Sequence, residues 1–183
     1  HSHGGISKYS YIKKDVLNII YESDVVVSMM IDFYRLPSDT PGFSESTEVQ
    51  THKEQADLLE ARMKEDLENS QNQRFDNFIP YIQLHEFEAL VFASINGITD
   101  LFERNEMNYD GLIDVIRQYP NPEDINNLPD TAPSVRLKKL IYGYNKVVDG
   151  INIITTAGMS VLLEKCPRFK DWVERMETAL REE

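Results

Sequence analysis

The sequence lacks the features that would place it quickly in a common class. It contains one cysteine, Cys166, among 183 residues, which excludes a disulfide framework and a cysteine zinc site. It contains no apolar run close to the ~20 residues of a membrane span and no secretory signal. We therefore expect a cytoplasmic protein without a membrane partner, and we interpret Cys166, which precedes Pro167, as a structural thiol at a helix end.

Several common catalytic motifs are also missing. There is no Gly-rich phosphate loop of Walker or dinucleotide type, and no second histidine after His85-Glu86 completes an HExxH zinc motif. A GxSxG nucleophile elbow is absent as well. The net charge of −12 argues against a broadly basic surface for nucleic acid. It does not exclude a metal-dependent nuclease, because a carboxylate cluster is itself acidic and a partner can hold the nucleic acid.

Two short apolar segments predict buried strands. Residues 25–31, VVVSMMI, form a continuous apolar run that is typical of a parallel strand covered on both faces. Residues 78–82, FIPYI, form a second run, and the change of pattern at Leu84 predicts that a helix starts there. Together with helical spacing elsewhere, these runs predict an α/β fold with a small, mostly parallel sheet flanked by helices.

The remainder of the chain is predicted to be largely helical. Residues 33–46 contain proline and glycine and are predicted to form a loop. We expect two parts, an α/β core over residues 1–95 and a helical C-terminal part over residues 96–183 that packs on it. The spacing of apolar residues and the capping residues predict helices over 7–23, from Ser46 or Thr47 to about 69, over 134–142 with Ser134 as cap, and over 171–182.

Ionisable side chains gather at the junction after the second strand. His85, Glu86 and Glu88 stand between apolar runs, where burying a charge without a partner is costly. Glu86 and Glu88 do not share one face of a regular helix, but in a first turn both can reach the strand end. The alternative is that the two acids only stabilise the helix N-terminus and that His85 is structural. Otherwise His85 could orient a carboxylate, bind a metal or act as an acid or base.

Asp32 ends the first strand, where open α/β sheets place their ligands; alternatively it caps a turn. With Glu86 and Glu88 it forms a set of oxygen ligands that suits Mg²⁺ or Mn²⁺ rather than zinc. Two such ions can clamp an in-line phosphoryl displacement. A cationic side chain would complete the site, unless the basic residues only form a solvated helix face. The candidates are Arg136, Lys138, Lys139 and Lys146, with Arg136 and Lys139 as phosphate-binding residues.

Four segments carry the most distinctive sequence: IDFYRLPSDTPGF, YIQLHEFEALVF, PEDINNLPDTAPSVRLKKLIYGYNK and CPRFKDW. In this order they resemble an uncharacterised prokaryotic family, the domain-of-unknown-function family four-two-seven-six, over most of the chain. Members of that family typically begin with a short strand that ends in a glutamate motif like VEGxTE. The opening HSHGGISKY, with His1 and His3, resembles a later Gly-Gly stretch of the family rather than a tag. The resemblance therefore implies a missing N-terminal strand and a missing catalytic glutamate.

More distantly, the pattern resembles a Toprim domain, as in the overcoming-lysogenization-defect nucleases. That resemblance implies a glutamate after the first strand, a DxD pair after a later strand and a third acid that opens a helix. Asp32 matches the first acid of the pair, and Glu88, in FEAL, matches the helix-opening glutamate. Tyr34 stands where the second acid of the pair belongs, which weakens the case for two metals. Lys139 or Lys146 matches a lysine of the nucleases.

The leading hypothesis is a Toprim-like protein that cleaves phosphodiester bonds with Mg²⁺ or Mn²⁺ held by Asp32, Glu86, Glu88 and the missing glutamate. Genes of the family often lie beside ABC-type or related ATPases, so the resemblance implies an ATPase partner in a defence system, with nucleic acid as substrate. The protein could also form a homo-oligomer. The second hypothesis is a non-catalytic module that regulates an ATPase, which Tyr34 and the acidic charge favour. The third is another phosphoryl-transfer enzyme that acts on nucleotides or small phosphates.

Overall fold

The computed structural model describes residues 8–125, 128 and 130–181. The opening histidines, His1 and His3, lie outside the described residues. The chain divides into two units, one formed by residues up to Leu84 together with those from Trp172 onward, and the other by His85–Asp171. Each unit is described by itself. Among the described helices, none is both long enough and apolar enough to cross a membrane.

The first unit is built on a parallel pair of strands. Strands β1 (Val27–Asp32) and β2 (Phe78–Gln83) pair in register, with Val27 opposite Phe78 and Asp32 opposite Gln83. Both strands lie where the apolar runs predicted them. The predicted α/β class, with a small parallel sheet flanked by helices, is therefore confirmed.

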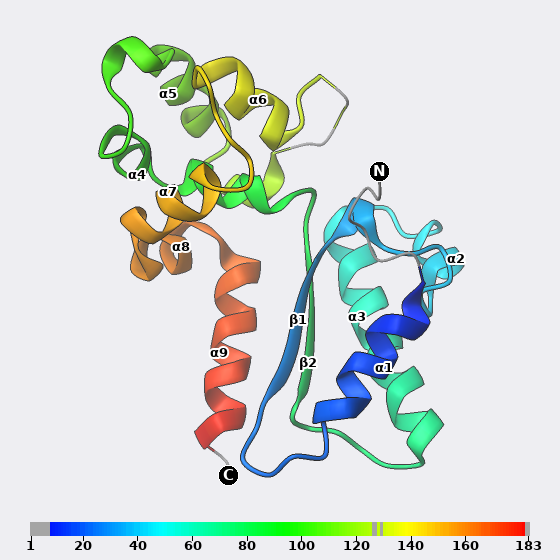
Figure 1. Cartoon of the computed structure of the whole chain (residues 1–183). Coiled ribbons are helices and arrows are strands. Elements are labelled where there is room, and N and C mark those ends of the chain that lie inside the picture. The colour runs from blue at the N-terminus through cyan, green and yellow to red at the C-terminus, as the bar shows by residue number, and fades with distance from the viewer. Residues whose placement is uncertain (1–7, 126–127, 129, 182–183) are drawn as a thin grey trace. The chain divides into compact units, whose positions relative to one another are not determined.

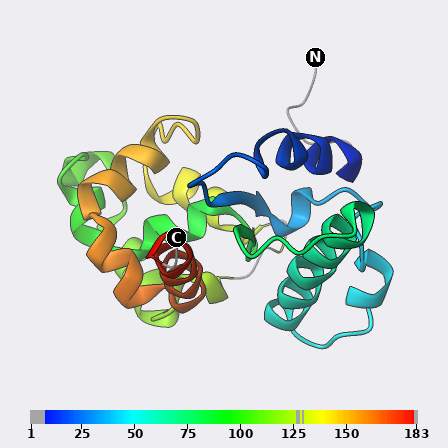
Figure 2. The same cartoon turned by 90° about the horizontal axis from the view of Figure 1, so that it is seen from below.

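Helices cover both faces of this sheet (Figures 1 and 2). On one face, α1 (Tyr9–Ile19) and α3 (His52–Gln71) contribute apolar side chains to a common core with the strands. On the other face lies the part of α9 (Pro167–Arg181) that begins at Trp172. The Trp172 ring stacks on Tyr81 with 4.7 Å between the ring centroids, and its Nε1 donates a hydrogen bond of 2.8 Å to Ser28 Oγ. The C-terminal part of α9 thus covers the face of the sheet that α1 and α3 do not contact.

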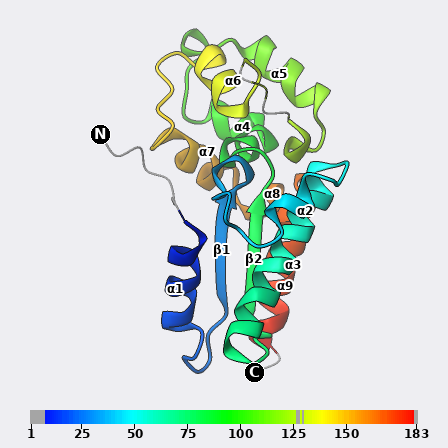
Figure 3. The same ribbon diagram turned by 90° about the vertical axis from the view of Figure 1, so that its right-hand side faces the viewer.

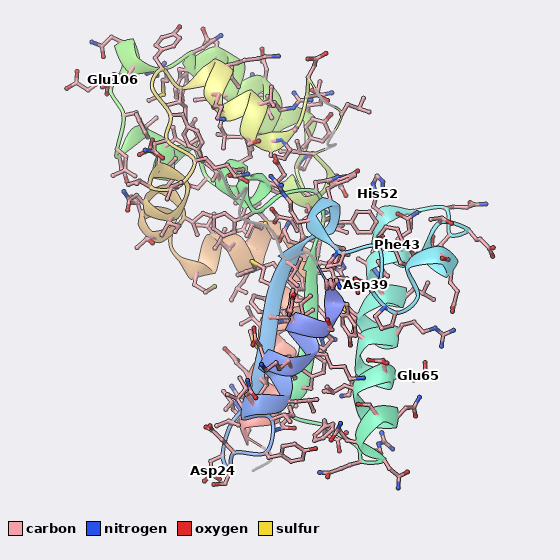
Figure 4. The ribbon with its side chains drawn as sticks, turned by 45° about the vertical axis from the view of Figure 1, so that its right-hand side comes forward. Asp24, Asp39, Phe43, His52, Glu65 and Glu106 are labelled. Carbon is pink, nitrogen blue, oxygen red and sulfur yellow. The ribbon has the colours of Figure 1, made fainter. Side chains whose placement is uncertain are left out.

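The segment between β1 and α3 differs in detail from its prediction as a loop. It contains the one-turn helices η1 (Phe33–Arg35) and α2 (Phe43–Ser46). Helix α3 begins after Thr51 rather than after Ser46 or Thr47, because Thr51 and Glu54 form a reciprocal capping box, a geometry that satisfies two backbone donors at once. Asp39, labelled in Figure 4, accepts the backbone N–H of Tyr9 at 3.0 Å and so tethers the start of α1 to this segment.

The second unit is helical, as expected for the C-terminal part. It begins with η2 (Phe87–Ala93), a 3-10 helix, where the sequence predicted that a helix starts at Leu84. The helices around it lie close together in Figure 3. They are α4 (Ile95–Thr99), η3 (Arg104–Glu106), α5 (Tyr109–Gln118), η4 (Pro122–Asp124), α6 (Pro133–Leu140), α7 (Asp149–Ala157) and α8 (Met159–Lys165).

The position of η2 explains why the units divide after Leu84 rather than after the predicted residue 95. Val91 and Phe92, from η2, belong to the core of the helical unit, together with Leu112, Leu137 and other apolar residues of its helices. Burial of apolar area is the main favourable term in packing. The η2 segment therefore belongs with the residues that cover it rather than with the sheet.

A buried acid supports the start of α9 within the second unit. Glu123, which is 1% exposed, accepts the backbone N–H groups of Arg168 and Phe169 at 2.8 and 3.0 Å. It thereby satisfies first-turn donors that have no partner within the helix. The neighbouring Cys166 is buried, and burial, followed by the charge of Glu123, raises the pKa of its thiol to about 12. These properties agree with a structural thiol.

Candidate functional site

The candidate site begins at a sharp backbone turn. His85 is 5% exposed and has φ of +63°, in the left-handed region that few residues other than glycine adopt. Glu86 follows in extended conformation as the residue before η2, and Glu88 is the second residue of η2. The turn therefore places both acids at the start of a helical segment, as predicted, while His85 takes up the change of direction.

Glu86 contacts the N-terminus of α6. Its Oε2 accepts the backbone N–H of Ser134 at 3.0 Å. Ser134 was predicted to cap this helix, but it lies inside the first turn, and Ala132 is the N-cap residue without a side-chain bond. A carboxylate at a helix N-terminus interacts favourably with the unsatisfied N–H groups and the dipole. The N-cap residue of α6 thus provides no side-chain acceptor for the first-turn N–H groups. Glu86, which is 48 residues away in sequence, provides one instead.

Lys146 joins the two acids. Its Nζ lies 2.9 Å from Glu88 Oε1 and 3.4 Å from Glu86 Oε1. The three side chains differ strongly in exposure: Glu88 is 2% exposed, Glu86 18% and Lys146 40%. One ammonium group thus neutralises a buried carboxylate and a partly buried one, from the solvent side.

Two polar atoms in this neighbourhood are buried without a hydrogen-bond partner among the described residues. They are Oε2 of Glu88 and the hydroxyl of Tyr144. Buried polar side-chain atoms in native structures usually have a partner, and leaving one unsatisfied costs about 1–3 kcal/mol. One oxygen of Glu88 is therefore paired with Lys146, and the other is available to a group that the described residues do not supply.

The electrostatics fix the charge states of the site. For Glu86, burial acts to raise the pKa, but the hydrogen bonds from Ser134 and the charge of Lys146 outweigh it and lower the pKa below its usual range. For Tyr144, burial raises the pKa most, and the charges of Glu88, Asp149 and Glu86 raise it further. At neutral pH, Glu86 is thus an anion and Tyr144 a neutral hydroxyl that can donate a hydrogen bond.

Two of the other predicted basic residues, Arg136 and Lys139, make contacts elsewhere in the second unit. Nε of Arg136 donates to the carbonyl of Thr131 at 2.7 Å, and Nζ of Lys139 donates to the carbonyl of Asp130 at 3.1 Å. Both contacts hold the connection that precedes α6. Of Lys139 and Lys146, the two lysines that match the lysine of the nucleases, Lys146 is the one that the structure brings to the acids.

Asp32 is the last residue of β1, as predicted. It belongs to the first unit, whereas Glu86 and Glu88 belong to the second. Its role as a metal ligand therefore stays a prediction from the sequence.

The acids of the second unit suit a hard divalent cation. Carboxylate oxygens are the ligands that Mg²⁺ and Mn²⁺ prefer, and Mg²⁺ is commonly held by one or two carboxylates, with water and substrate phosphates completing its coordination. Two carboxylate oxygens here already converge on one ammonium group, and Glu88 has a further oxygen to offer. No group of three or more Asp, Glu, His and Cys side chains is placed to hold a metal within the described part of the chain. The pair fits a cation that shares its coordination with a substrate.

Tyr144 was not singled out by the sequence analysis, although its segment, LIYGYNK, was among the distinctive ones. Its ring belongs to the core of the helical unit, and its hydroxyl has no hydrogen-bond partner among the described residues. That property has no signature in the sequence.

Comparison with known proteins gives a family without an assigned activity. The family described as a domain of unknown function (DUF4276) matches residues 1–177. No curated protein matches the chain, and no solved structure does. The more distant Toprim resemblance stays a prediction. Because the match extends over nearly the whole sequence, the chain belongs to the DUF4276 family.

Proposed function

We propose that the protein is a divalent-cation-dependent hydrolase of phosphodiester bonds, with Glu86, Glu88 and Lys146 in its active site. The observation that carries this proposal is the state of Glu88. Its side chain is 2% exposed, one oxygen is paired with Lys146, and the other has no partner among the described residues. A buried carboxylate that the chain satisfies only in part is typical of a ligand site, because its burial is otherwise costly.

Glu88 and Glu86 would hold the cation, Mg²⁺ or Mn²⁺, which when bound supplies Lewis-acid polarisation of a phosphoryl oxygen. The two acids differ in what else they do. Glu86 is fixed by the backbone N–H of Ser134, so that its orientation does not depend on the ligand. Glu88 has no such second anchor in the part of the chain that the structure describes, and it is held by burial and by Lys146.

Lys146 would place positive charge where negative charge grows during the reaction. Its side chain is 40% exposed, which leaves it accessible to a substrate, although its Nζ contacts both acids. A lysine binds phosphate as a point charge on a flexible stem. Removal of one such electrostatic group typically slows the chemical step by about 10²–10³-fold.

The substrate and the partner enter the proposal from resemblance alone. The Toprim resemblance implies a nucleic acid as substrate and Asp32 as a further ligand, and the family resemblance implies an ATPase in the same system. Asp32→Ala tests that part separately. In the full chain we expect this substitution to abolish metal-dependent cleavage while the circular dichroism spectrum stays that of the wild type.

The first experiment is calorimetric titration of Mn²⁺ into the wild type, Glu88→Gln and Glu164→Gln. Glu164 is the matched control, since it is also paired with a lysine at 2.9 Å but is 69% exposed. We expect saturable binding to the wild type and the control, and binding at least tenfold weaker to Glu88→Gln. Absence of Mn²⁺ binding to the folded wild type would overturn the metal site.

The second experiment measures hydrolysis of bis-p-nitrophenyl phosphate with Mn²⁺ present. We expect Lys146→Met to lower the rate by roughly a hundredfold. Lys165→Met, which removes the lysine of the exposed control pair, should leave the rate unchanged. Equal rates for the two variants would contradict the role of Lys146.

A second candidate function is an interaction module without catalytic activity. It is favoured by three exposed apolar side chains close to Lys146 in sequence: Val147 is 78% exposed, Val148 50% and Ile151 58%. Exposed apolar side chains that cluster commonly mark protein-binding surfaces. In that case Lys146 would only neutralise the acids. The wild type would then bind no Mn²⁺, and Val147→Ser would weaken binding to an ATPase partner of the kind that the family resemblance implies.

A further inference from the structure

The side chain of Tyr144 combines a structural ring with an unsatisfied hydroxyl. The residue is 7% exposed, and its ring packs in the core of the helical unit. Its hydroxyl is buried and has no hydrogen-bond partner in the described part of the chain. A phenylalanine would fill the same core without this cost. The hydroxyl therefore calls for a role that packing does not provide.

The surroundings place the hydroxyl near η2, the segment that contains Glu88. A Cβ atom built on Gly150 would lie 3.0 Å from the Tyr144 hydroxyl, 3.8 Å from Cε1 of Phe87 and 3.9 Å from Cγ2 of Val91. Phe87 and Val91 both belong to η2 and flank Glu88 in sequence. Gly150, at the start of α7, therefore leaves space between the hydroxyl and these two side chains of η2, because it has no side chain of its own.

We infer that Tyr144 is a ligand-binding residue, whose hydroxyl donates a hydrogen bond to an oxyanion held next to Glu88. The inference rests on the proposed function for the nature of that oxyanion, which would be the phosphoryl group of the substrate. Two observations support it: among the described residues, Glu88 and Tyr144 each have a buried polar atom without a partner, and the hydroxyl of Tyr144 lies near η2, which contains Glu88.

The chemistry of the hydroxyl agrees with this role. Burial and the charges of Glu88, Asp149 and Glu86 raise the pKa of Tyr144, so that it keeps its proton at neutral pH. A protonated phenol can donate to an oxyanion without adding charge of either sign. The positive charge that the oxyanion needs beside two carboxylates comes from Lys146 and, in the proposed reaction, from the cation.

The test compares the wild type with Tyr144→Phe by three measurements: the melting temperature without ligands, calorimetric binding of Mn²⁺, and calorimetric binding of inorganic phosphate with and without Mn²⁺. Removal of an unsatisfied hydroxyl should leave the melting temperature unchanged or raise it. Mn²⁺ affinity should change by less than about twofold. Phosphate affinity should fall by roughly ten- to a hundredfold, the usual effect of losing a hydrogen bond to a charged group.

Gly150→Ala provides an independent check through the space around the hydroxyl. Alanine suits a helix position, but its Cβ would crowd the hydroxyl at 3.0 Å. We expect Gly150→Ala to weaken phosphate binding in the wild type and to have little further effect in the Tyr144→Phe background, where the crowded atom is gone.

The possible results separate this inference from the proposed function. Absence of Mn²⁺ binding to the wild type would overturn the metal site, and phosphate binding without Mn²⁺ would then decide the role of Tyr144. Equal phosphate affinity of wild type and Tyr144→Phe, or no phosphate binding to the wild type, would overturn the inference. A lower melting temperature of Tyr144→Phe with unchanged phosphate affinity would show that the hydroxyl is structural.

Discussion

Removal of Lys146 should destabilise the protein through the carboxylate it leaves behind. In Lys146→Met, the carboxylate of Glu88, 2% exposed, loses the ammonium at 2.9 Å. Exposed ion pairs contribute about 0.2–1 kcal/mol, whereas breaking a buried pair costs about 3–5 kcal/mol. Because Lys146 is itself 40% exposed, solvent screens part of the interaction. We expect the free energy of unfolding to fall by about 1–3 kcal/mol.

A double-mutant cycle isolates the contribution of the pair. In the Glu88→Gln background no buried charge remains at that position, so Lys146→Met should cost about 1 kcal/mol less there than in the wild type. Urea unfolding followed by circular dichroism measures all four proteins. The control cycle uses Glu164 and Lys165, whose ion pair has the same length but is exposed on both sides, and its coupling should be below about 0.5 kcal/mol. A Lys146–Glu88 coupling no larger than that of the control would refute this reasoning.

Three further predictions concern other contacts. Glu123→Ala removes the acceptor of two backbone N–H groups of α9 and should lower the free energy of unfolding in urea by about 3–5 kcal/mol, whereas a loss below 1 kcal/mol would contradict its capping role. Thr51→Ala should cost about 1 kcal/mol and Thr47→Ala less than half of that, because only Thr51 caps α3; equal losses would favour the helix start predicted from the sequence. The pKa of Glu86 is lower in the folded state than the ordinary glutamate value of about 4.3. This difference stabilises the folded protein above about pH 4.3, and the stabilisation is lost as the pH falls through the folded-state pKa. The acid limb of a thermal-melting profile should therefore be less steep in Glu86→Gln, and an unchanged limb would argue against that shift.

The sequence predicted the elements whose signals are local. The apolar runs located both strands, and Asp32 ends β1 as expected, since strand length and burial follow from consecutive residues. The junction after β2 was predicted as the place of the ionisable cluster, and Glu86 and Glu88 do begin η2. The start of α3 was predicted too early, because several residues in that segment can cap a helix, and only the reciprocal bonds of Thr51 and Glu54 distinguish the true start.

The sequence by itself thus determined the class of fold, the two strands and the acids at the start of η2. Only the tertiary structure decided what meets those acids. Lys146 is 60 residues from Glu86 in sequence, and nothing local distinguishes it from Lys139, which bonds the carbonyl of Asp130 instead. The hydroxyl of Tyr144 likewise gained its place from the packing of its ring and from the missing side chain of Gly150. Charge pairing and hydrogen-bond satisfaction depend on distances of a few ångströms between distant segments, and those distances exist only after the chain has folded.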